Sequence, residues 1–388
     1  MNLVFKDFYA LKVETEFYIG SGILRNKDLL SFPETENALL IIDHNVIDQD
    51  YFKTFIVLLK ELYKEVAVMK NKEIEPTTIT VNSMVESIKK RNIGVVFGAG
   101  GGSTLDIAKA VAVLLTNPGR AEDYQGMDKL LNPGILCITI PTVAGSGAEL
   151  TPSAVLINTE KRFKGGINGR FVAPTRAILD PKATIKAPLS ATMYSAFDAF
   201  VHALESHTCK LASPVVKMFA SEALRILLRA IPDIVDDLEN IKIREDLLLA
   251  SEYAVIALMH SEPGPMASFG YQLAIRHGVP HGLANAIAIS KTMEIQIEKG
   301  ANYSFLYELL PEKSEARTIK DKSISAHRYV SEIIRKGKIP GNLKAYGFMP
   351  EHYEELAVFV DNVKKGFPTA MTEFNKQDLL NVLLSFYE

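Results

Sequence analysis

A glycine run that follows an apolar strand pattern and opens directly into a helical pattern constrains the fold more than any other feature. The apolar residues are Val95-Val96-Phe97, and the run is Gly100-Gly101-Gly102-Ser103. Glycines let the backbone turn tightly and approach a bound group, while the first amides of a helix offer unpaired donors. The order of glycines lacks the last glycine of the GxGxxG fingerprint, so an ordinary Rossmann domain is not indicated. The stretch predicts a strand–turn–helix unit that is either a phosphate cradle or a purely structural turn.

Short apolar runs alternate with helical patterns between about residues 38 and 180. The runs at 38–42, 66–69, 93–97 and 135–140 are typical of buried strands. Such alternation predicts a mainly parallel, doubly wound sheet, in which ligands bind beyond the carboxyl ends of the strands. A second glycine turn, Gly145-Ser146-Gly147, follows the last of these runs, so both glycine turns are expected at the binding edge.

The pattern changes after Pro188 to long helical periodicity, with helices expected over residues 217–231, 246–259 and 315–336. Two prolines interrupt the chain between Asp180 and Leu189. We therefore expect an α/β domain over residues 1–183 and an all-helical domain over residues 184–388.

Composition narrows the class of protein. The chain has 388 residues, 47% of them hydrophobic, a net charge of −3 and two cysteines. The charge disfavours a nucleic-acid partner or an acidic membrane, which require basic surfaces. Charged residues interrupt the segment 1–17, and no apolar segment reaches the ~20 residues of a membrane span. We expect a reduced, cytoplasmic protein with a small-molecule partner.

Five ordered segments carry a resemblance to a known family. They are GGGSTLDIAK at residues 100–109, IPTVAGSGAE at 140–149, AILDP at 177–181, FDAFVHALE at 197–205 and PHGLANA at 280–286. Together they resemble the iron-containing (group III) alcohol dehydrogenases, whose wider fold includes glycerol dehydrogenase and dehydroquinate synthase. The resemblance implies an NAD-binding first domain and a second domain that binds metal and substrate.

The resemblance assigns Asp43, which ends the apolar run 38–42, to the selection of NAD over NADP. A carboxylate there accepts hydrogen bonds from the ribose hydroxyls and repels a 2′-phosphate. The alternative is a solvated turn aspartate, because His44-Asn45 is also typical of turns. The resemblance implies a wider set of cofactor-binding residues, namely Gly100, Gly101, Gly102, Ser103, Asp106, Thr142, Ser146 and Lys164.

Two of these polar residues have other interpretations. Ser103 can cap its helix instead of binding the cofactor, or do both. Asp106 lies one turn into the same helix, where a carboxylate complements the helix dipole, and its family counterpart faces the cleft. Asp106 is therefore a candidate both for cofactor binding and for catalysis.

Asp198 and His202 are four residues apart on an apolar helical segment, so both side chains leave the same face. The resemblance implies that they bind a divalent metal, iron or zinc, together with His281 of the Pro-His-Gly turn. Without the resemblance, a pair at this spacing is more often a contact on a helix surface. The three residues form the predicted metal site.

The chain departs from the family pattern at Ala267, fourteen residues before His281, where the family has a further histidine ligand. Catalytic zinc commonly uses three protein ligands and water, so a three-ligand site is chemically reasonable. His260, His277 and Glu262 are weaker candidates for the missing ligand.

The resemblance implies reversible hydride transfer between NAD and a primary alcohol or aldehyde, with the metal polarising the substrate oxygen. Tyr271 either donates a hydrogen bond or relays a proton, or it only packs in the core. Residues 114–119 and 124–126, with Tyr271, are similar to the branch containing 3-deoxy-octulosonate 8-oxidase. That similarity suggests a sugar or sugar-acid substrate.

Three other functions stay open. Ala267 is compatible with a metal-free reductase like the maleylacetate reductases, or with an NAD-binding protein without turnover. A lyase like dehydroquinate synthase, which uses NAD transiently, is the third. Family members are often dimers or larger, so a homo-oligomer is expected.

Overall fold

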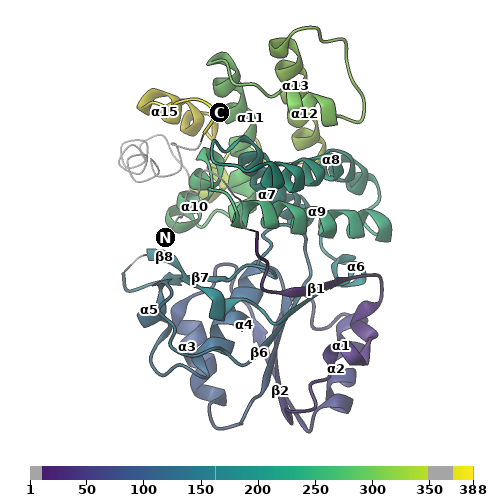
Figure 1. The fold of residues 1–388 in the computed structure, drawn as a ribbon, viewed down its shortest axis with the longest axis vertical. Coiled ribbons are helices and arrows are strands. Elements are labelled where there is room, and N and C mark those ends of the chain that lie inside the picture. The colour runs from purple at the N-terminus through teal and green to yellow at the C-terminus, as the bar shows by residue number, and fades with distance from the viewer. Residues whose placement is uncertain (1–10, 162, 348–369, 388) are drawn as a thin grey trace.

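The computed structural model describes residues 11–161, 163–347 and 370–387. Figure 1 shows an α/β part at the bottom of the view and a bundle of helices at the top. This arrangement confirms the fold class expected from the sequence. The division at residues 183 and 184 stays a prediction, although the last strand ends at Leu179 and the first long helix begins at Leu189.

Six parallel strands form the main sheet, in the order β1-β9-β6-β4-β2-β3. The register pairs Asp43 with Asn71 and Gly100 with Pro141, so these strands end along one edge. The four strands expected from the apolar runs are confirmed. The six strands are β1 (Glu16–Ile19), β2 (Asn37–Asp43), β3 (Glu65–Asn71), β4 (Val95–Gly100), β6 (Leu136–Pro141) and β9 (Arg176–Leu179).

Helices cover both faces of this sheet because successive strand residues point to opposite sides. Leu39 and Ile41 of β2 belong to one apolar cluster, whereas Leu40 and Ile42 belong to another. Burying each such side chain contributes ~1.5–3 kcal/mol. The helices of this part are α1 (Lys27–Leu30), α2 (Asp50–Leu62), α3 (Thr78–Ile88), α4 (Gly102–Leu114), α5 (Ala121–Tyr124) and α6 (Pro181–Thr184), with short 3-10 helices at Ile23–Arg25 and Arg170–Val172.

A second, smaller sheet was not expected from the sequence. Its order is β5-β8-β7, with β7 and β8 antiparallel. Gly165 and Gly166 in its central strand weaken the strand signal, since glycine offers no side chain to pack. The Gln125 amide donates to the carbonyls of Leu156 and Gly165 and so holds two strands together. The strands are β5 (Gly126–Met127), β7 (Ser153–Asn158) and β8 (Phe163–Asn168).

The helical part is built around α7, whose residues Phe197 and Phe200 are fully buried. Ser213 caps the next helix by accepting a hydrogen bond from the Val216 amide, and Pro214 occupies its first turn. The three helices expected from periodicity are confirmed. The helices are α7 (Leu189–Thr208), α8 (Pro214–Asp236), α9 (Ile241–Met259), α10 (Pro265–His277), α11 (His281–Glu298), α12 (Ser304–Leu309), α13 (Ile319–Lys336) and α15 (Lys376–Ser385), with a 3-10 turn at Lys344–Tyr346.

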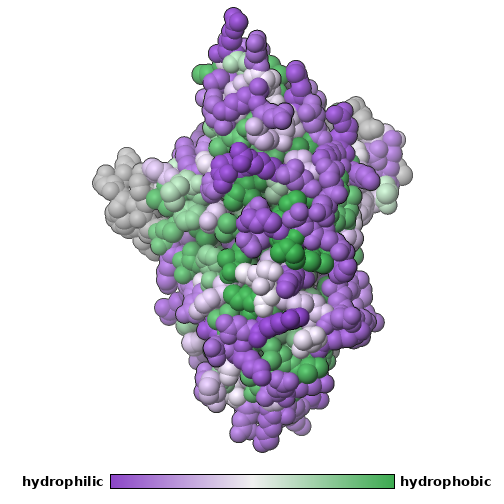
Figure 2. All heavy atoms as spheres, turned by 90° about the vertical axis from the view of Figure 1, so that its right-hand side faces the viewer, coloured by the Kyte–Doolittle hydropathy of each residue, from purple (hydrophilic) through white to green (hydrophobic). Residues whose placement is uncertain are grey.

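Hydrophobic and hydrophilic residues are interspersed on the face shown in Figure 2, and hydrophilic residues dominate its two ends. Across the described ranges, no helix combines the length and the apolar character that crossing a membrane requires. The sequence also predicts that segment 1–17, which charged residues interrupt, is not an apolar targeting segment. Residues 1–10 of that segment lie outside the described part of the chain.

The second glycine turn joins the α/β part to the helices. A Cβ atom on Gly145 would lie 2.3 Å from the carbonyl oxygen of Ser195 in α7. Gly147 has a φ of 63°, and a Cβ there would lie 2.3 Å from Cβ of Val255 in α9. Any larger residue would push the turn away from both helices, which explains why the loop needs glycine at these two positions.

Two buried glutamates also face each other across this junction. Glu149 follows the glycine turn, and Glu252 lies on α9 with no exposed surface. Burial raises the pKa of both carboxyl groups, and the negative charge of Glu149 raises that of Glu252 further. A proton kept on Glu252 lets it donate to Glu149 and avoids two buried like charges.

This pair predicts a pH-dependent stability. Above the ordinary glutamate pKa of about 4.3, the unfolded chain releases the Glu252 proton while the folded chain keeps it, so stability falls as the pH rises. Glu252→Gln should remove this loss and increase the free energy of unfolding by ~1–3 kcal/mol at pH 8, with a much smaller change at pH 4.5. Denaturant unfolding at several pH values measures this difference.

Glu245→Gln on the same helix is the matched control, because Glu245 pairs with Lys242 at the surface. It should leave the pH dependence of unfolding unchanged. A stability difference between Glu252→Gln and the wild type that does not vary with pH would contradict the shared proton.

Candidate active site

A cleft of about 520 Å³ lies at the carboxyl ends of the strands and reaches residues of the α/β part and of the helices. Of the predicted site residues, Gly100 does not line the cleft, although it ends β4 directly before the glycine turn. The structure therefore brings the predicted cofactor side and the predicted metal side to one space. The predicted residues that line it are Asp43, Gly101, Gly102, Ser103, Asp106, Thr142, Ser146, Lys164, Asp198, His202, Tyr271 and His281.

The two glycine turns meet at this cleft. Gly101 is the N-cap residue of α4, and no side chain caps that helix. A Cβ on Gly102 would lie 2.7 Å from the Ser146 hydroxyl of the second turn, so glycine allows the two loops to touch. The free amides of the α4 N-terminus and its positive dipole end thus face the cleft, which suits a phosphate group.

Ser103 does not cap the helix that it begins. Its hydroxyl donates a hydrogen bond to the carbonyl of Ile74, in the loop after β3. The capping interpretation of Ser103 is therefore wrong, and the serine instead ties the glycine turn to a neighbouring loop while lining the cleft.

Asp43 takes part in a turn and also lines the cleft. Its Oδ1 atom accepts hydrogen bonds from the Asn45 backbone amide at 2.8 Å and from the Asn45 side chain at 3.0 Å. The turn chemistry expected as an alternative is thus present. It fixes the carboxylate at the end of β2, where a ribose would lie in the cofactor interpretation.

Asp106 is held by a buried lysine. Lys109 has no exposed surface, lies 2.8 Å from the Asp106 carboxylate and donates to the Ala148 carbonyl at 2.7 Å. Asp106 also accepts a hydrogen bond from the Val155 amide at 3.2 Å. Burial raises the pKa of Asp106, and the Lys109 charge opposes that rise. This pair connects α4 to the second glycine turn and to β7, whatever further role Asp106 has.

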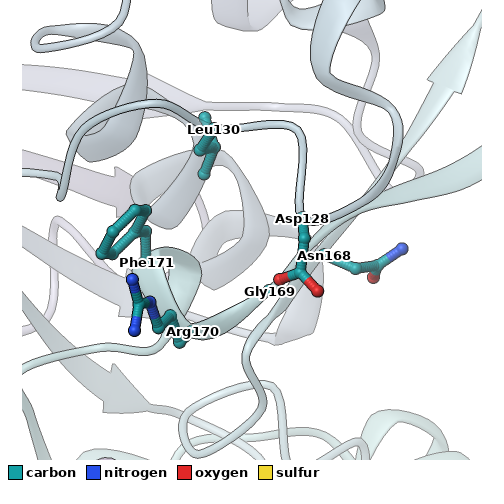
Figure 3. Close-up of a pocket in the computed structure, with 6 residues that line it drawn as sticks. All are labelled: Asp128, Leu130, Asn168, Gly169, Arg170 and Phe171. Atoms are coloured by element: carbon teal, nitrogen blue, oxygen red, sulfur yellow. The ribbon is translucent and has the colours of Figure 1, made fainter. Parts of the chain in front are cut away.

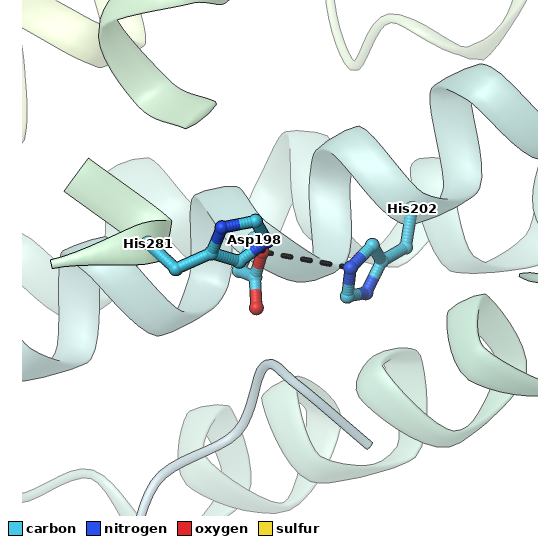
Figure 4. Close-up of side chains that lie close together, drawn as sticks. All are labelled: Asp198, His202 and His281. Carbon is cyan, nitrogen blue, oxygen red and sulfur yellow. Dashed lines mark ion pairs between the residues drawn. The ribbon is translucent and has the colours of Figure 1, made fainter. Parts of the chain in front are cut away.

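Three potential metal ligands converge from two helices, as Figure 4 shows. Asp198 Oδ1 lies 3.5 Å from Nε2 of His202 and 3.6 Å from Nε2 of His281. Asp198 and His202 are one turn apart on α7, and His281 is the first residue of α11. Their ligand atoms all lie within 4.8 Å of one another, and no other group of this kind occurs in the described residues.

The chemistry of these three groups fits a divalent metal. Burial lowers the pKa of His281, with the Asp198 charge opposing the shift, so its ring is neutral and able to coordinate. His202 Nδ1 is buried without a hydrogen-bond partner among the described residues. Two imidazoles beside a carboxylate are a donor set that iron(II) and zinc both accept.

Asn285 is a site residue that the sequence reasoning missed. Its amide donates to Asp198 Oδ1 at 2.7 Å and lies 3.3 Å from His281 Nε2. The side chain is fully buried and stands one helical turn after His281 on α11. The sequence did indicate Asn285 indirectly, because a spacing of four residues from His281 places both side chains on one face of a helix. Asn285 orients the carboxylate from outside the ligand set.

Ala267 leaves the site with three ligands. It is buried in the apolar core of the helical part, and its amide donates to Glu205. The weaker candidates do not replace the missing histidine. His260 accepts a hydrogen bond from the Lys12 amide, and neither it, His277 nor Glu262 belongs to the metal-binding group in the described chain.

Tyr271 stands at the boundary between the two sides of the cleft. Its ring meets that of His281 edge to face, with centroids 5.3 Å apart, and the Lys164 ammonium lies 5.3 Å from its centroid. The side chain is 37% exposed, so simple core packing does not describe it. Desolvation raises the pKa of Tyr271 to about 12, assisted by the charges of nearby carboxylates, so its hydroxyl stays protonated and can donate.

A second cavity of about 350 Å³ lies elsewhere in the α/β part and contains none of the predicted site residues. Figure 3 shows Arg170 beside Phe171 on one side and Asp128 with Asn168 on the other. The Arg170 guanidinium lies 4.7 Å from the Phe171 ring centroid. The cavity brings no potential metal-binding group together.

Comparison with known proteins agrees with this geometry. Residues 15–181 match the family described as iron-containing alcohol dehydrogenase, and residues 192–387 match the C-terminal part of the Fe-containing alcohol dehydrogenase family. The NAD-dependent methanol dehydrogenase of Bacillus methanolicus is 28% identical over 344 residues, which cover 88% of each chain. The sulfoacetaldehyde reductase of Bilophila wadsworthia is 27% identical over 282 residues, 72% of this chain and 73% of the relative.

A solved structure shares the whole fold. Sulfoacetaldehyde reductase from Bifidobacterium kashiwanohense, in complex with NAD+, superimposes with a TM-score of 0.86 at 20% identity and covers 98% of both chains. At that identity the likeness concerns the fold alone. The two family matches together span nearly all of the sequence, and the chain belongs to the iron-containing alcohol dehydrogenase family.

Proposed function

We propose that this chain is an NAD-dependent oxidoreductase that interconverts a primary alcohol and an aldehyde. The observation that carries the proposal is the single cleft that a glycine-rich helix N-terminus shares with a largely buried Asp-His-His cluster. Two relatives support the cofactor, since one is named as NAD-dependent and a solved one is in complex with NAD+. The family itself supports the reaction class.

The α/β side of the cleft would bind the cofactor. The amides of Gly101, Gly102 and Ser103 at the start of α4 donate to a pyrophosphate. Asp43 accepts from the ribose hydroxyls and disfavours the extra phosphate of NADP. Thr142 and Ser146, in the second turn, supply hydroxyl donors.

Asp198, His202 and His281 would hold the metal, with Asn285 orienting the carboxylate. When bound, the metal supplies a Lewis acid that polarises the substrate oxygen, and NAD supplies the hydride acceptor. Tyr271 stays protonated and donates a hydrogen bond to the substrate or passes a proton toward solvent. The apolar core of α7 behind the ligands excludes water from their far side.

The finer substrate class is part of the proposal. The resemblance of residues 114–119 and 124–126, with Tyr271, to the 3-deoxy-octulosonate 8-oxidase branch suggests a sugar or sugar-acid alcohol. A cytoplasmic location and a homo-oligomer stay predictions from the sequence. Activity restricted to simple alkanols in a screen of polyols and ulosonates would contradict the sugar-like substrate.

A metal-free reductase is the second candidate, and Ala267 is the observation that favours it. With one ligand fewer, Tyr271 and Lys164 would have to polarise the carbonyl oxygen by themselves. The missing histidine ligand is also compatible with a protein that binds NAD but does not turn over a substrate. A lyase that uses NAD only transiently would give no net absorbance change at about 340 nm, which separates it from a dehydrogenase.

The metal site can be tested by metal content. After incubation with iron(II) or zinc and NAD, the wild type should retain about one metal per chain, and His202→Ala should lose it, because two ligands do not hold the ion. Asn285→Ala should weaken metal binding by ~10–100-fold through loss of the group that orients Asp198. Elemental analysis after dialysis measures both effects.

His260→Gln is the control for the metal measurement, since His260 lies outside the cluster. It should retain the metal like the wild type. Absence of metal from the wild type under these conditions would favour the metal-free reductase or the protein without turnover.

The cofactor preference can be tested at Asp43. Asp43→Asn keeps a turn-forming side chain but removes the charge, so kcat/KM with NADP relative to NAD should rise by ~10-fold or more. Asp48→Asn removes an exposed carboxylate from the same loop and should leave the ratio unchanged. If both variants keep the wild-type ratio, Asp43 serves only the turn.

A further inference from the structure

We infer that Glu75 sets the charge of the substrate: by neutralising Lys164 it makes the site select uncharged alcohols and aldehydes and reject anionic ones. This inference rests on the proposed function and narrows its substrate class, because it favours uncharged sugar-like alcohols over the sugar acids that the resemblance also allows. It concerns a residue that no motif indicated, since Glu75 lies in the loop between β3 and α3.

The ion pair lies inside the cleft. Lys164 Nζ is 2.5 Å from Glu75 Oε2, and both residues line the cleft. The side chains are only 7% and 20% exposed, respectively. A pair so shielded from solvent is much stronger than one at the surface, so Glu75 effectively occupies the lysine.

Lys164 is placed to meet a substrate. Its ammonium lies 5.3 Å from the Tyr271 ring centroid, and that ring lies 5.3 Å from the His281 ring. The Tyr271 ring thus contacts both the lysine and a residue of the metal-binding cluster. An acidic group on a substrate held at the cluster would occupy the same cleft as this ammonium.

Apart from the metal that the Asp198 cluster would hold for the reacting oxygen, the other charges of the cleft do not favour an anion. The Asp106 carboxylate is paired with Lys109, and Glu73 accepts hydrogen bonds from Thr77 and Thr80. Lys72 is exposed and follows β3, whose last residue pairs with Asp43 of β2. The described lining residues carry carboxylates at Asp43, Glu73, Glu75, Asp106 and Asp198 but lysines only at 72 and 164.

A bound anion would therefore have to break the Glu75 pair or remain unpaired in a poorly solvated site. An uncharged hydroxyl compound neither breaks the ion pair nor buries an unpaired charge. Removing the Glu75 carboxylate reverses the preference between the two kinds of substrate, because Lys164 then becomes a buried cation without its partner. The same site should then accept an anionic substrate.

The test compares two substrates of equal length that differ in charge, 1,3-propanediol and 3-hydroxypropanoate, at saturating NAD. In the wild type, kcat/KM should favour the diol by at least about tenfold. In Glu75→Gln, the ratio should move toward the acid by about tenfold or more. Glu75→Asp, which keeps the charge, should stay close to the wild-type ratio.

Two further variants test whether the change in substrate preference comes from the Glu75–Lys164 pair or from the altered net charge of the protein. Glu36→Gln removes a carboxylate from an exposed ion pair with Lys64 and should leave the ratio unchanged. Adding Lys164→Met to Glu75→Gln should abolish the gain for the acid. A wild type that uses both substrates equally, or an active Glu75→Gln with the wild-type ratio, would overturn the inference.

Binding distinguishes this inference from the proposed function. Ligand-observed NMR with the inert analogues propanoate and propanamide reports affinity without turnover. If no alcohol yields NADH but Glu75→Gln binds propanoate about tenfold more tightly than the wild type does, the proposed function fails and the charge selection stands. Equal propanoate affinity in the two proteins would refute the charge selection even in an active enzyme.

Discussion

The close packing of the second glycine turn against α7 and α9 is the constraint on which the site depends. Gly145 lies against the backbone of Ser195 in α7, three residues before Asp198. The contact that positions the turn therefore lies within one helical turn of the metal-binding cluster. Gly147 packs closely against the Val255 side chain of α9. Because protein interiors are close-packed, a side chain at either position would displace the turn from the helices. The position of the turn beside the cleft is therefore fixed by close contact with both helices rather than by long, adaptable side chains.

Buried charges hold the loops around this contact. Lys109 connects the glycine-loop helix to the carbonyls of the second turn, and Asp106 compensates its charge. Glu149 reaches the helical part, where it meets Glu252. A buried ion that loses its partner is costly, so each of these groups fixes the position of its neighbours. The same loops then present Ser146 and Thr142 to the cleft.

The sequence predicted the parts of this structure that depend on local pattern. Apolar runs gave the four central strands, and the four-residue spacing of Asp198 and His202 placed both on one face of α7. Contacts between distant segments were not accessible in this way. The Glu75–Lys164 pair joins residues 89 apart, and Asn285 reaches Asp198 from another helix. The small sheet also escaped prediction, because Gly165-Gly166 carries little strand signal.

Ala267 shows why a missing ligand need not disturb the rest of the site. The start of α10 is fixed by Glu205 of α7, which accepts hydrogen bonds from the amides of Gly264, Met266 and Ala267. Burial raises the pKa of Glu205 to about 7, whereas these backbone bonds lower it and favour the carboxylate that complements the helix dipole. The position of α10 thus depends on a carboxylate of α7 and not on a metal bond from residue 267. Tyr271, one turn further along the same helix, packs edge to face against His281.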